Sequence, residues 1–353
     1  MKIRGLLVPG TGATVLRDSI GHNLGNPNRP DTAFGLGALA ARSPQEAVET
    51  LAMEHRAGQW APLRSSAKDG RSILPGHVLT ALYTTIPDDW AHYMYDWRAD
   101  IRHNAERLVR WLQTRTREGE RWHMVAHSQG TLVAVLAAKM MEDEERFSRY
   151  VARLRLVAPP FAGTVAAGRW MIDGLSPASD GTVLDRAFDA VGSFLTEAQG
   201  ETALDNLQQA VRTWPALYQM LPVWRAARTE DGTLSLLDDD TWAGHEAIDP
   251  ALLARARETR EWLLDPLSHL VGVDVQLLMT MHRDTPVEMV HRDGKLTSEV
   301  ALNEPGDTLI PFDRTLAPYG ERLKALTRDV DKADELHNML VSDEGVWSYA
   351  KPA

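Results

Sequence analysis

The sequence has no cysteine among its 353 residues, and this absence excludes three kinds of chemistry. The chain can form no disulfide, can use no thiol as a nucleophile and can bind no metal through thiolates. It also has no uninterrupted apolar run of 18 residues or more, so we expect no membrane-spanning helix. A lack of cysteine fits any compartment, so it does not decide where the protein works.

Positive charge is also in short supply, with 38 Lys and Arg residues against 49 Asp and Glu residues and a net charge of −11. This balance argues against nucleic acid or an anionic membrane surface as the main partner, because both require a basic face. The apolar stretch within Met1–Gly10 is far too short for the apolar region of a signal peptide. We therefore expect a cytoplasmic protein without stable membrane insertion. The sequence does not indicate an oligomeric state.

Hydrophobic patterning predicts strands that alternate with helices, which is typical of the α/β class. Alternation of this kind predicts a mostly parallel sheet with helices on both faces. Strands are expected at 3–8, 90–95, 122–127, 154–158 and 273–281, and helices at 101–117 and 129–142. A hairpin is expected from strands at 287–290 and 296–301 around Asp293-Gly294, and a helical tail over 320–350.

The rhythm changes between residues 161 and 270, where strand signals vanish and the pattern is helical. We interpret this stretch as an inserted, mainly helical cap, called the cap segment below. Residues 1–160 and 271–353 then form the core of the fold. The tryptophans and other apolar residues of the cap segment suggest either an apolar substrate surface or simply the interior of the cap itself.

The helix expected at 101–117 should begin after Asp100, which can accept hydrogen bonds at the amino end. One stripe of this helix is apolar and should face the core: Ile101, Ala105, Leu108, Val109 and Leu112. The opposite face should carry polar side chains: Arg102, Asn104, Arg107 and Arg110.

The most informative stretch is Trp122–Gly130, which is typical of a strand, a sharp turn and a helix with Ser128 at the turn. Such a turn holds a serine hydroxyl clear of the backbone and within reach of a base. Small residues at Ala126 and Gly130 let the strand and helix pass closely, although the usual motif has glycine at both positions. We predict Ser128 as a catalytic nucleophile. The segment Ala126–Gly130 is called the elbow below.

A serine needs a base to take its proton and an acid to orient that base. In sheet hydrolases these follow the nucleophile in the order acid, then base. Asp307, in a turn flanked by glycine and proline, is the predicted acid, with Asp284 as its rival after the preceding strand. His337 is the only histidine after His291, so it is the predicted base. Activity should fall when His337 is protonated, because an imidazolium cannot accept the serine proton.

The reaction also needs hydrogen-bond donors for the negative oxygen that develops on the substrate. The backbone N–H of Gln129, directly after the nucleophile, is one expected donor. The other should lie in the turn after the first strand, where we choose the N–H of Thr11, with Gly12 as the second choice. A phosphate-binding loop is not supported there, because no Gly-Lys-Ser/Thr sequence follows.

Other polar residues are expected to be structural. His127 should point to the opposite side of the strand from Ser128. Asp238–Asp240 is interpreted as a solvated loop, because no histidine or glutamate lies at ligand spacing beside it. We predict no metal site and no cofactor.

Several strings occur in a fixed order along nearly the whole chain: Val8–Gly10, Tyr95–Arg98, Ala126–Gly130, Pro160–Thr164, Met220–Pro222, Gly306–Pro311 and His337. Taken together, they resemble the lecithin:cholesterol acyltransferase-like α/β-hydrolases. The Tyr-Asp-Trp-Arg string and the turn with Asp307 are the specific matches, and the elbow is shared by many hydrolases. The chain departs from the family at Ala126, in the residues after Asp307 and in having no cysteine. The disulfides and lipoprotein binding of the secreted members are therefore not carried over. Asp96, Trp97 and Arg98 are expected to brace the core.

The leading hypothesis is a serine ester hydrolase, like a carboxylesterase or lipase, with a Ser-His-Asp triad and an acyl-enzyme intermediate. Its partner would be a small-molecule or lipid-like ester, meaning an apolar or amphiphilic acyl ester or a lactone. An acyltransferase or a phospholipase of the same fold remains an alternative, because the same residues serve both transfer and hydrolysis. A catalytically silent binding module with a hydrolase fold is the alternative from another class. Paired carboxylates for an acid hydrolase have no supporting motif.

Overall fold

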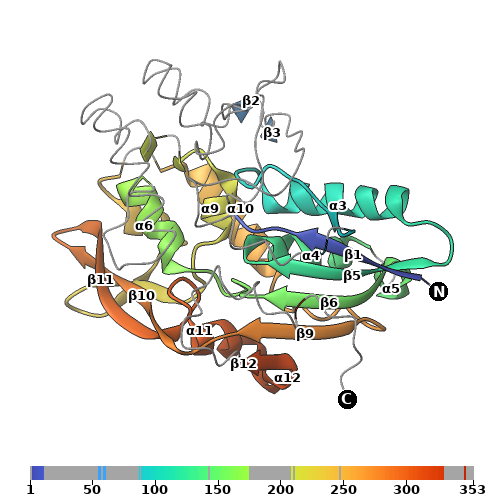
Figure 1. Cartoon of the computed structure of the whole chain (residues 1–353). Helices are drawn as coiled ribbons and strands as arrows, with labels where there is room; N and C mark the ends of the chain where they lie inside the picture. Colours follow the sequence, from blue (N-terminus) through green and yellow to red (C-terminus); the bar gives the residue numbers. More distant parts are fainter. Residues whose placement is uncertain are drawn as a thin grey trace, which may run out of the picture.

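A six-stranded, all-parallel sheet forms the centre of the molecule, with strand order β12-β9-β6-β5-β1-β4 (Figure 1). The computed structural model describes residues 2–11, 55–56, 59–60, 87, 89–141, 144–174, 208–209, 211–245, 248–329 and 346. The strands of the sheet are β1 (Lys2–Val8), β4 (Ala91–His92), β5 (Glu120–His127), β6 (Val151–Val157), β9 (Asp274–Met279) and β12 (Thr327–Asp329). This confirms the predicted mostly parallel sheet and places the end of every strand at one edge.

The carboxyl-terminal halves of the interior strands are mostly apolar and buried, as expected for a parallel sheet that is covered on its faces. The residues with no exposed surface include Leu6, Val8, Met124, Ala126, Leu154, Leu156 and Leu277. Neighbouring strands pair in register, with Val8 opposite Ala126 and Ala126 opposite Leu156. The carboxyl ends of β1, β5 and β6 therefore lie level with one another.

Helices flank this sheet and connect its strands. They are α3 (Ile101–Arg115), α4 (Gln129–Met140), α5 (Glu144–Tyr150), α6 (Val165–Asp173), α9 (Pro215–Gln219), α10 (Pro250–Trp262), α11 (Phe312–Leu316) and α12 (Gly320–Leu326), with short 3-10 turns η2 (Asp239–Trp242) and η3 (Ala317–Tyr319). Helix α4 is buried along most of its length, which explains why it is apolar almost all round. Among the helices that the structure describes, each is too short or too polar to cross a lipid bilayer.

Helix α3 begins as predicted, because the Asp100 carboxylate accepts a hydrogen bond from the Arg102 amide at 2.8 Å. The expectation that Asn104 faces away from the core is wrong, because its side chain is fully buried. Its Nδ2 donates to the Asp96 carbonyl at 2.8 Å. A buried amide of this kind has a nonlocal partner that helical periodicity alone does not reveal.

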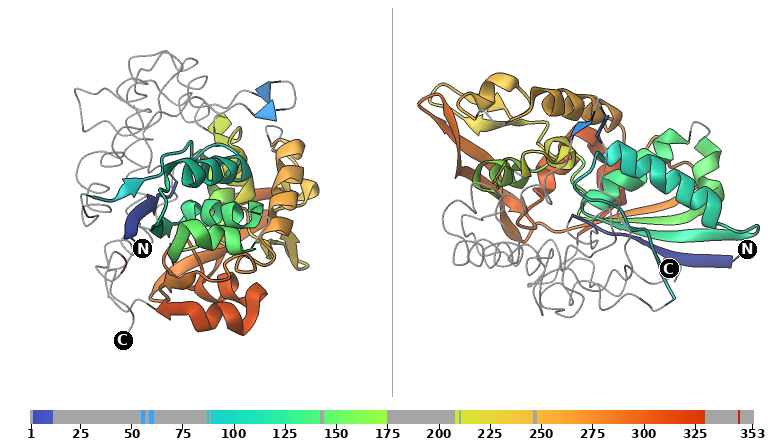
Figure 2. Two further views of the ribbon diagram at one scale, coloured as in Figure 1. Left: turned by 90° about the vertical axis from the view of Figure 1, so that its right-hand side faces the viewer. Right: turned by 90° about the horizontal axis from the view of Figure 1, so that it is seen from above.

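A second sheet lies beyond the carboxyl end of the central sheet, next to α6 (Figures 1 and 2). Its strand order is β11-β10-β7-β8, from β7 (Arg225–Arg228), β8 (Thr233–Ser235), β10 (Arg283–Arg292) and β11 (Lys295–Gly306). The hairpin turn between β10 and β11 is confirmed at Asp293 and Gly294, with φ angles of 53° and 76°. Positive φ at both central residues is the geometry that an Asp-Gly turn favours.

Three sequence expectations about secondary structure are wrong. The cap segment was expected to lack strands, but β7 and β8 lie inside it and pair with β10. The expected strand at 90–95 is limited to β4 (Ala91–His92). The expected helical tail over 320–350 contains β12 after α12, and apart from residue 346 its part after 329 lies outside the described residues. All these strands have only two to four residues. Segments this short show no recognisable apolar pattern in the sequence, and they are strands because a partner strand forms hydrogen bonds with them.

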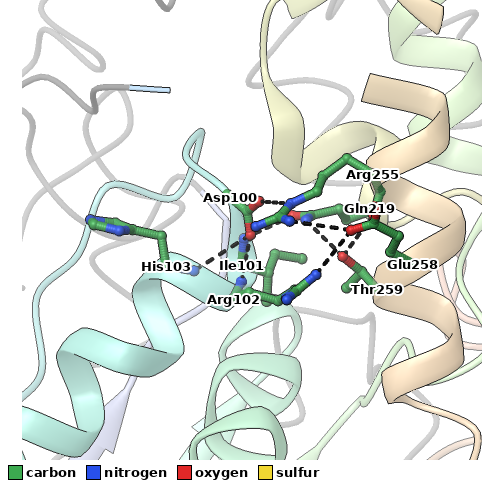
Figure 3. A network of polar contacts seen from close by, with 8 residues as sticks. All are labelled: Asp100, Ile101, Arg102, His103, Gln219, Arg255, Glu258 and Thr259. Carbon is green, nitrogen blue, oxygen red and sulfur yellow. Dashed lines mark hydrogen bonds and ion pairs between the residues drawn. The ribbon is translucent and has the colours of Figure 1, made fainter. Parts of the chain in front are cut away.

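A polar network connects α9 and α10, in the later part of the cap segment, to the amino end of α3 (Figure 3). The Asp100 carboxylate accepts from Arg255 Nε of α10 at 2.7 Å. The Gln219 side chain of α9 accepts from the Ile101 amide at 2.8 Å and donates to Thr259 of α10 at 2.9 Å. The amino end of α3 is thus joined to both α9 and α10.

The same network determines the charge state of Asp100. Burial alone would raise the pKa of this carboxyl, but hydrogen bonds from Gln219 and Arg255 and the positive charge of Arg255 outweigh it. The pKa of Asp100 is therefore lowered from its usual value of 3.8.

Candidate active site

Ser128 occupies the tip of the elbow predicted from the sequence. Strand β5 ends at His127 and helix α4 begins at Gln129, so Ser128 is the single residue between them. Its backbone has φ 51° and ψ −127°, a region that residues with a side chain rarely adopt. Strained backbone of this kind is held only where surrounding contacts determine it, and a strained turn between strand and helix is what the prediction of a nucleophile at Ser128 requires.

Hydrogen bonds fix the elbow on both sides of Ser128. The Ser128 amide donates to the Val157 carbonyl of β6 at 2.8 Å, and the Ser128 carbonyl accepts from the Thr131 hydroxyl at 2.6 Å. The Ser128 side chain makes no capping hydrogen bond to α4, although serine is a favoured residue at that position. The backbone is thus held, and the hydroxyl is not used to cap α4.

Two glycines allow the turn after β1 to pack directly against the elbow. A Cβ at Gly130 would lie 2.4 Å from the Val8 carbonyl oxygen, which no side chain could tolerate. A Cβ at Gly10 would lie 3.0 Å from the Ser128 Cβ. The segment Pro9–Thr11, which contains the predicted oxyanion donor Thr11 and is called the oxyanion turn below, therefore lies directly beside Ser128.

The two residues predicted to supply oxyanion donors are in contact. The Thr11 hydroxyl donates to Gln129 Oε1 at 2.8 Å, so Thr11 and Gln129 lie side by side next to Ser128. Gln129 is the first residue of α4, and the amide at this position has no carbonyl acceptor within the helix. The positive end of the helix dipole also lies there, which favours negative charge.

The Tyr95–Arg98 segment braces this region from the other side of β1. The Tyr95 hydroxyl donates to the Pro9 carbonyl at 2.6 Å. Asp96 and Arg98 form a two-pronged ion pair, with Nη2 and Oδ2 at 2.9 Å, and both side chains are fully buried. The Trp97 ring packs edge-on against Trp214, with ring centroids 5.1 Å apart. These side chains lie in the core, as the sequence predicted.

The predicted acid, Asp307, follows β11 in a tight turn, Gly306–Pro311, called the acid turn below. Its side chain is buried, and Oδ1 accepts from the amides of Leu309 at 3.0 Å and Ile310 at 2.6 Å. Thr308 has φ 84°, which is strained for a β-branched residue, and its amide donates to Thr285 Oγ1 at 2.9 Å. The turn thus fixes the Asp307 carboxylate through one oxygen.

A hydrogen bond ties the acid turn to the loop that follows β6. Thr164 donates its hydroxyl to the Leu309 carbonyl at 2.6 Å and accepts from the Ala166 amide at the start of α6. The rival acid, Asp284, is exposed on β10 opposite Pro305. Burial and backbone contacts therefore favour Asp307 over Asp284 as an orienting acid.

The predicted base, His337, lies outside the described residues, as does Gly12. Strand β12 ends at Asp329, and in the sequence His337 follows it by 337 − 329 = 8 positions. The strand runs parallel to β5, β6 and β9, so its carboxyl end lies at the same edge of the sheet as Ser128.

Two polar side chains, those of Arg260 and Tyr319, bind the loop that follows β6. The Phe161 carbonyl accepts from Arg260 Nη1 at 2.8 Å and from the Tyr319 hydroxyl at 2.9 Å. Arg260 is buried, and among the described residues its Nε and Nη2 have no hydrogen-bond partner. Burial lowers the pKa of Arg260 to about 10, so it still carries its charge at neutral pH.

Other polar residues singled out from the sequence lie at different distances from the site. His127 is buried at the end of β5, and a Cβ at Gly10 would lie 3.2 Å from its Nδ1, so its imidazole lies beside the turn that follows β1. Asp238, Asp239 and Asp240 are exposed, and Asp239 lies 3.6 Å from Arg257. Within the part of the chain that the structure describes, no group of three or more metal-binding side chains is arranged to hold an ion.

Comparison with solved structures supports the architecture. A chain in the crystal structure of a Tle4–Tli4 complex aligns with 98% of this chain and 96% of its own length, with a TM-score of 0.55 and 12% identity. The chain has an α/β-hydrolase fold. Two structures of the phospholipase PlaB from Legionella pneumophila, one with thio-NAD, align over 78% and 79% of this chain. They do so over 37% and 39% of their own length, with TM-scores of 0.30 and 0.32 at 12% and 11% identity. No protein-family model and no curated protein matches the sequence.

Within this α/β-hydrolase fold, the structure brings Thr11, Gln129 and Ser128 together and ties the Asp307 turn to a neighbouring loop. The sequence did not indicate the side-chain role of Gln129. No local pattern shows that a glutamine side chain will bridge two distant loops.

Proposed function

We propose that this chain is a serine ester hydrolase of the lipase-like type, with Ser128 as nucleophile, His337 as base and Asp307 as orienting acid. The observation that carries the proposal is the strained backbone of Ser128 between β5 and α4, directly beside the oxyanion turn. The α/β-hydrolase fold and the order of Ser128, Asp307 and His337 along the chain support it.

In the proposed reaction, Ser128 Oγ attacks the ester carbonyl carbon while His337 takes its proton. The N–H groups of Thr11 and Gln129 donate to the oxyanion of the tetrahedral intermediate. The alcohol leaves with the proton from His337 and an acyl-enzyme remains on Ser128. Water, deprotonated by His337, then releases the acid and restores the serine.

The substrate we propose is an apolar or amphiphilic acyl ester or a lactone. Residues 161–270 would form the cap that receives its acyl group, over a core of residues 1–160 and 271–353. We further propose kinship with the lecithin:cholesterol acyltransferase-like α/β-hydrolases, supported by the ordered strings from Val8–Gly10 to His337. The cytoplasmic location remains a prediction from the sequence.

The first experiment labels the protein with a fluorophosphonate probe and measures hydrolysis of a panel of acyl esters, phospholipids and lactones. Ser128→Ala should lose labelling and lower kcat by on the order of 10⁴-fold or more. Ser268→Ala, which changes a half-buried serine whose hydroxyl donates to the Asp265 carbonyl, is the matched control and should behave as wild type. Full activity in Ser128→Ala would refute the proposal and favour a binding module.

The proposed role of Asp307 as the acid is tested by Asp307→Asn, which replaces one carboxylate oxygen with an amide nitrogen. Asp307→Asn keeps Oδ1 as acceptor for the Leu309 and Ile310 amides, so the turn should survive while the charge is lost. We expect kcat to fall by on the order of 10⁴-fold, as for the equivalent change in a serine protease triad. The same change at exposed Asp284 should leave kcat unaltered, and the reverse result would move the acid role to Asp284.

Adding an acceptor alcohol to the wild-type assay separates hydrolysis from acyl transfer. The proposed hydrolase should release mainly free acid, because water attacks the acyl-enzyme. A predominance of the new ester would instead identify an acyltransferase that uses the same residues.

A further inference from the structure

The Gln129 side chain links the two residues proposed to stabilise the oxyanion. It is fully buried and makes two hydrogen bonds in opposite directions. Its Oε1 accepts from the Thr11 hydroxyl at 2.8 Å, and its Nε2 donates to the Trp97 carbonyl at 2.9 Å. A side-chain amide can satisfy both bonds at once only in one orientation, because its oxygen accepts and its nitrogen donates.

The Trp97 carbonyl, which receives the Gln129 amide, lies on a rigid segment. The flanking residues Asp96 and Arg98 form the fully buried ion pair, and the Arg98 amide also donates to Asp96 Oδ1 at 3.0 Å. Two residues before Trp97, the Tyr95 hydroxyl holds the Pro9 carbonyl. The Tyr95–Arg98 segment therefore contacts the oxyanion turn directly at Pro9 and indirectly, through Gln129, at Thr11.

This arrangement matters because an oxyanion hole stabilises a transition state only if its donors are aimed before the reaction begins. The Gln129 amide is already fixed as the first residue of α4. The Thr11 amide lies in a turn that follows Gly10, where the backbone is least restricted. The Thr11 hydroxyl bond to Gln129 Oε1 ties Thr11 itself directly to the helix, in addition to the hydrogen bond that holds Pro9.

We propose that the Gln129 side chain is a positioning residue, which orients the Thr11 amide toward the oxyanion through the Thr11 hydroxyl. The Tyr95–Arg98 segment supports it by fixing the Gln129 side chain. This inference rests on the proposed function, and it gives the Tyr-Asp-Trp-Arg string a task in catalysis without contact with substrate.

The test removes the side-chain hydrogen bonds of Thr11 and Gln129 and leaves the backbone amides of both residues in place. Thr11→Val removes only the hydroxyl donor and should lower kcat about 10-fold with KM within about twofold, because the lost interaction forms in the transition state. Gln129→Met, which removes both bonds, should lower kcat by about 10-fold to 100-fold. Thr11→Ser keeps the hydroxyl and should restore most of the lost kcat. Thr114→Val, at an exposed position on α3, is the control for the same exchange and should leave kcat unchanged.

A trifluoromethyl ketone gives a second readout, since it adds to the serine and forms an oxyanion in the same place. Its inhibition constant should rise in Thr11→Val and Gln129→Met by the same factor as kcat/KM falls, whereas a merely structural role would not link the two quantities. Unfolding midpoints close to wild type show that the fold is intact. If Gln129→Met does not fold, Thr11→Val and Thr11→Ser decide the question alone.

A kcat within twofold of wild type in folded Thr11→Val would overturn the inference, and so would equal losses in Thr11→Val and Thr11→Ser. Ser128→Ala, assayed in parallel, separates the two proposals. If Ser128→Ala is inactive and Thr11→Val is fully active, the positioning role fails and the proposed function stands. If Ser128→Ala is active, both fail.

Discussion

Replacing Asp96 with asparagine should destabilise the protein far more than any exposed charge change of the same kind. The exchange keeps the shape of the side chain but removes its charge, and it places an N–H group where Oδ2 now accepts from Arg98 Nη2 at 2.9 Å. Because both side chains have 0% exposure, no water can replace the lost carboxylate. A buried pair broken on one side typically costs about 3–5 kcal/mol, and we expect a loss in that range.

Urea denaturation measures this loss as a fall in the free energy of unfolding, with the slope against urea concentration compared between variants. Glu258→Gln is the matched control, since Glu258 is 58% exposed and pairs with Arg102 at 3.2 Å, so its change should cost less than about 1 kcal/mol. Adding Arg98→Met to Asp96→Asn should recover part of the loss by removing the stranded charge. A loss below about 1 kcal/mol in Asp96→Asn would refute the reasoning that burial governs this pair.

Two further predictions concern the acid turn and the network at α3. Thr164→Val should lower kcat about 10-fold, because the acid turn loses the 2.6 Å hydrogen bond to the Leu309 carbonyl. Thr164→Ser keeps the hydroxyl and should keep most of the activity. Equal kcat values in the two variants would contradict this prediction. The lowered pKa of Asp100 means that its carboxyl binds a proton more tightly in the unfolded chain than in the folded protein. The contribution of Asp100 to stability is therefore present above its usual pKa of 3.8, and it is lost as the pH falls through the pKa of the folded state. Unfolding free energies between pH 5 and pH 3 should therefore decline less steeply in Asp100→Asn than in wild type, and identical slopes would show that the contacts with Arg255 and Gln219 do not stabilise the charged form.

The parts of the fold that follow from the sequence are those with a strong local signal. The carboxyl-terminal halves of the interior strands are mostly apolar, and the Asp293-Gly294 turn favours a positive φ, so both were predicted correctly. The strand, turn and helix around Ser128 were predicted correctly because small residues and an apolar helix follow one another there in a fixed local order. The candidate site was thus predictable where a single short segment determines the geometry.

The parts that could not be predicted depend on contacts between distant segments. Strand β12 has only three residues and owes its hydrogen bonds to β9. Asn104 is polar, yet it is buried because the Asp96 carbonyl accepts from it. The Gln129 side chain depends on Thr11 and Trp97, which come from two other parts of the chain. Neither periodicity nor composition contains information about such partners.

The order of strands in the central sheet has a consequence for how the protein is made. From β5 onward, each new strand of the sheet is laid against the one made before it, since β6 joins β5, β9 joins β6 and β12 joins β9. A chain emerging from the ribosome can therefore extend the sheet in one direction as synthesis proceeds. Between β9 and β12, however, the ribosome must first produce the long β10–β11 hairpin. During that interval β9 offers an open edge, the kind of surface on which nascent chains associate with one another.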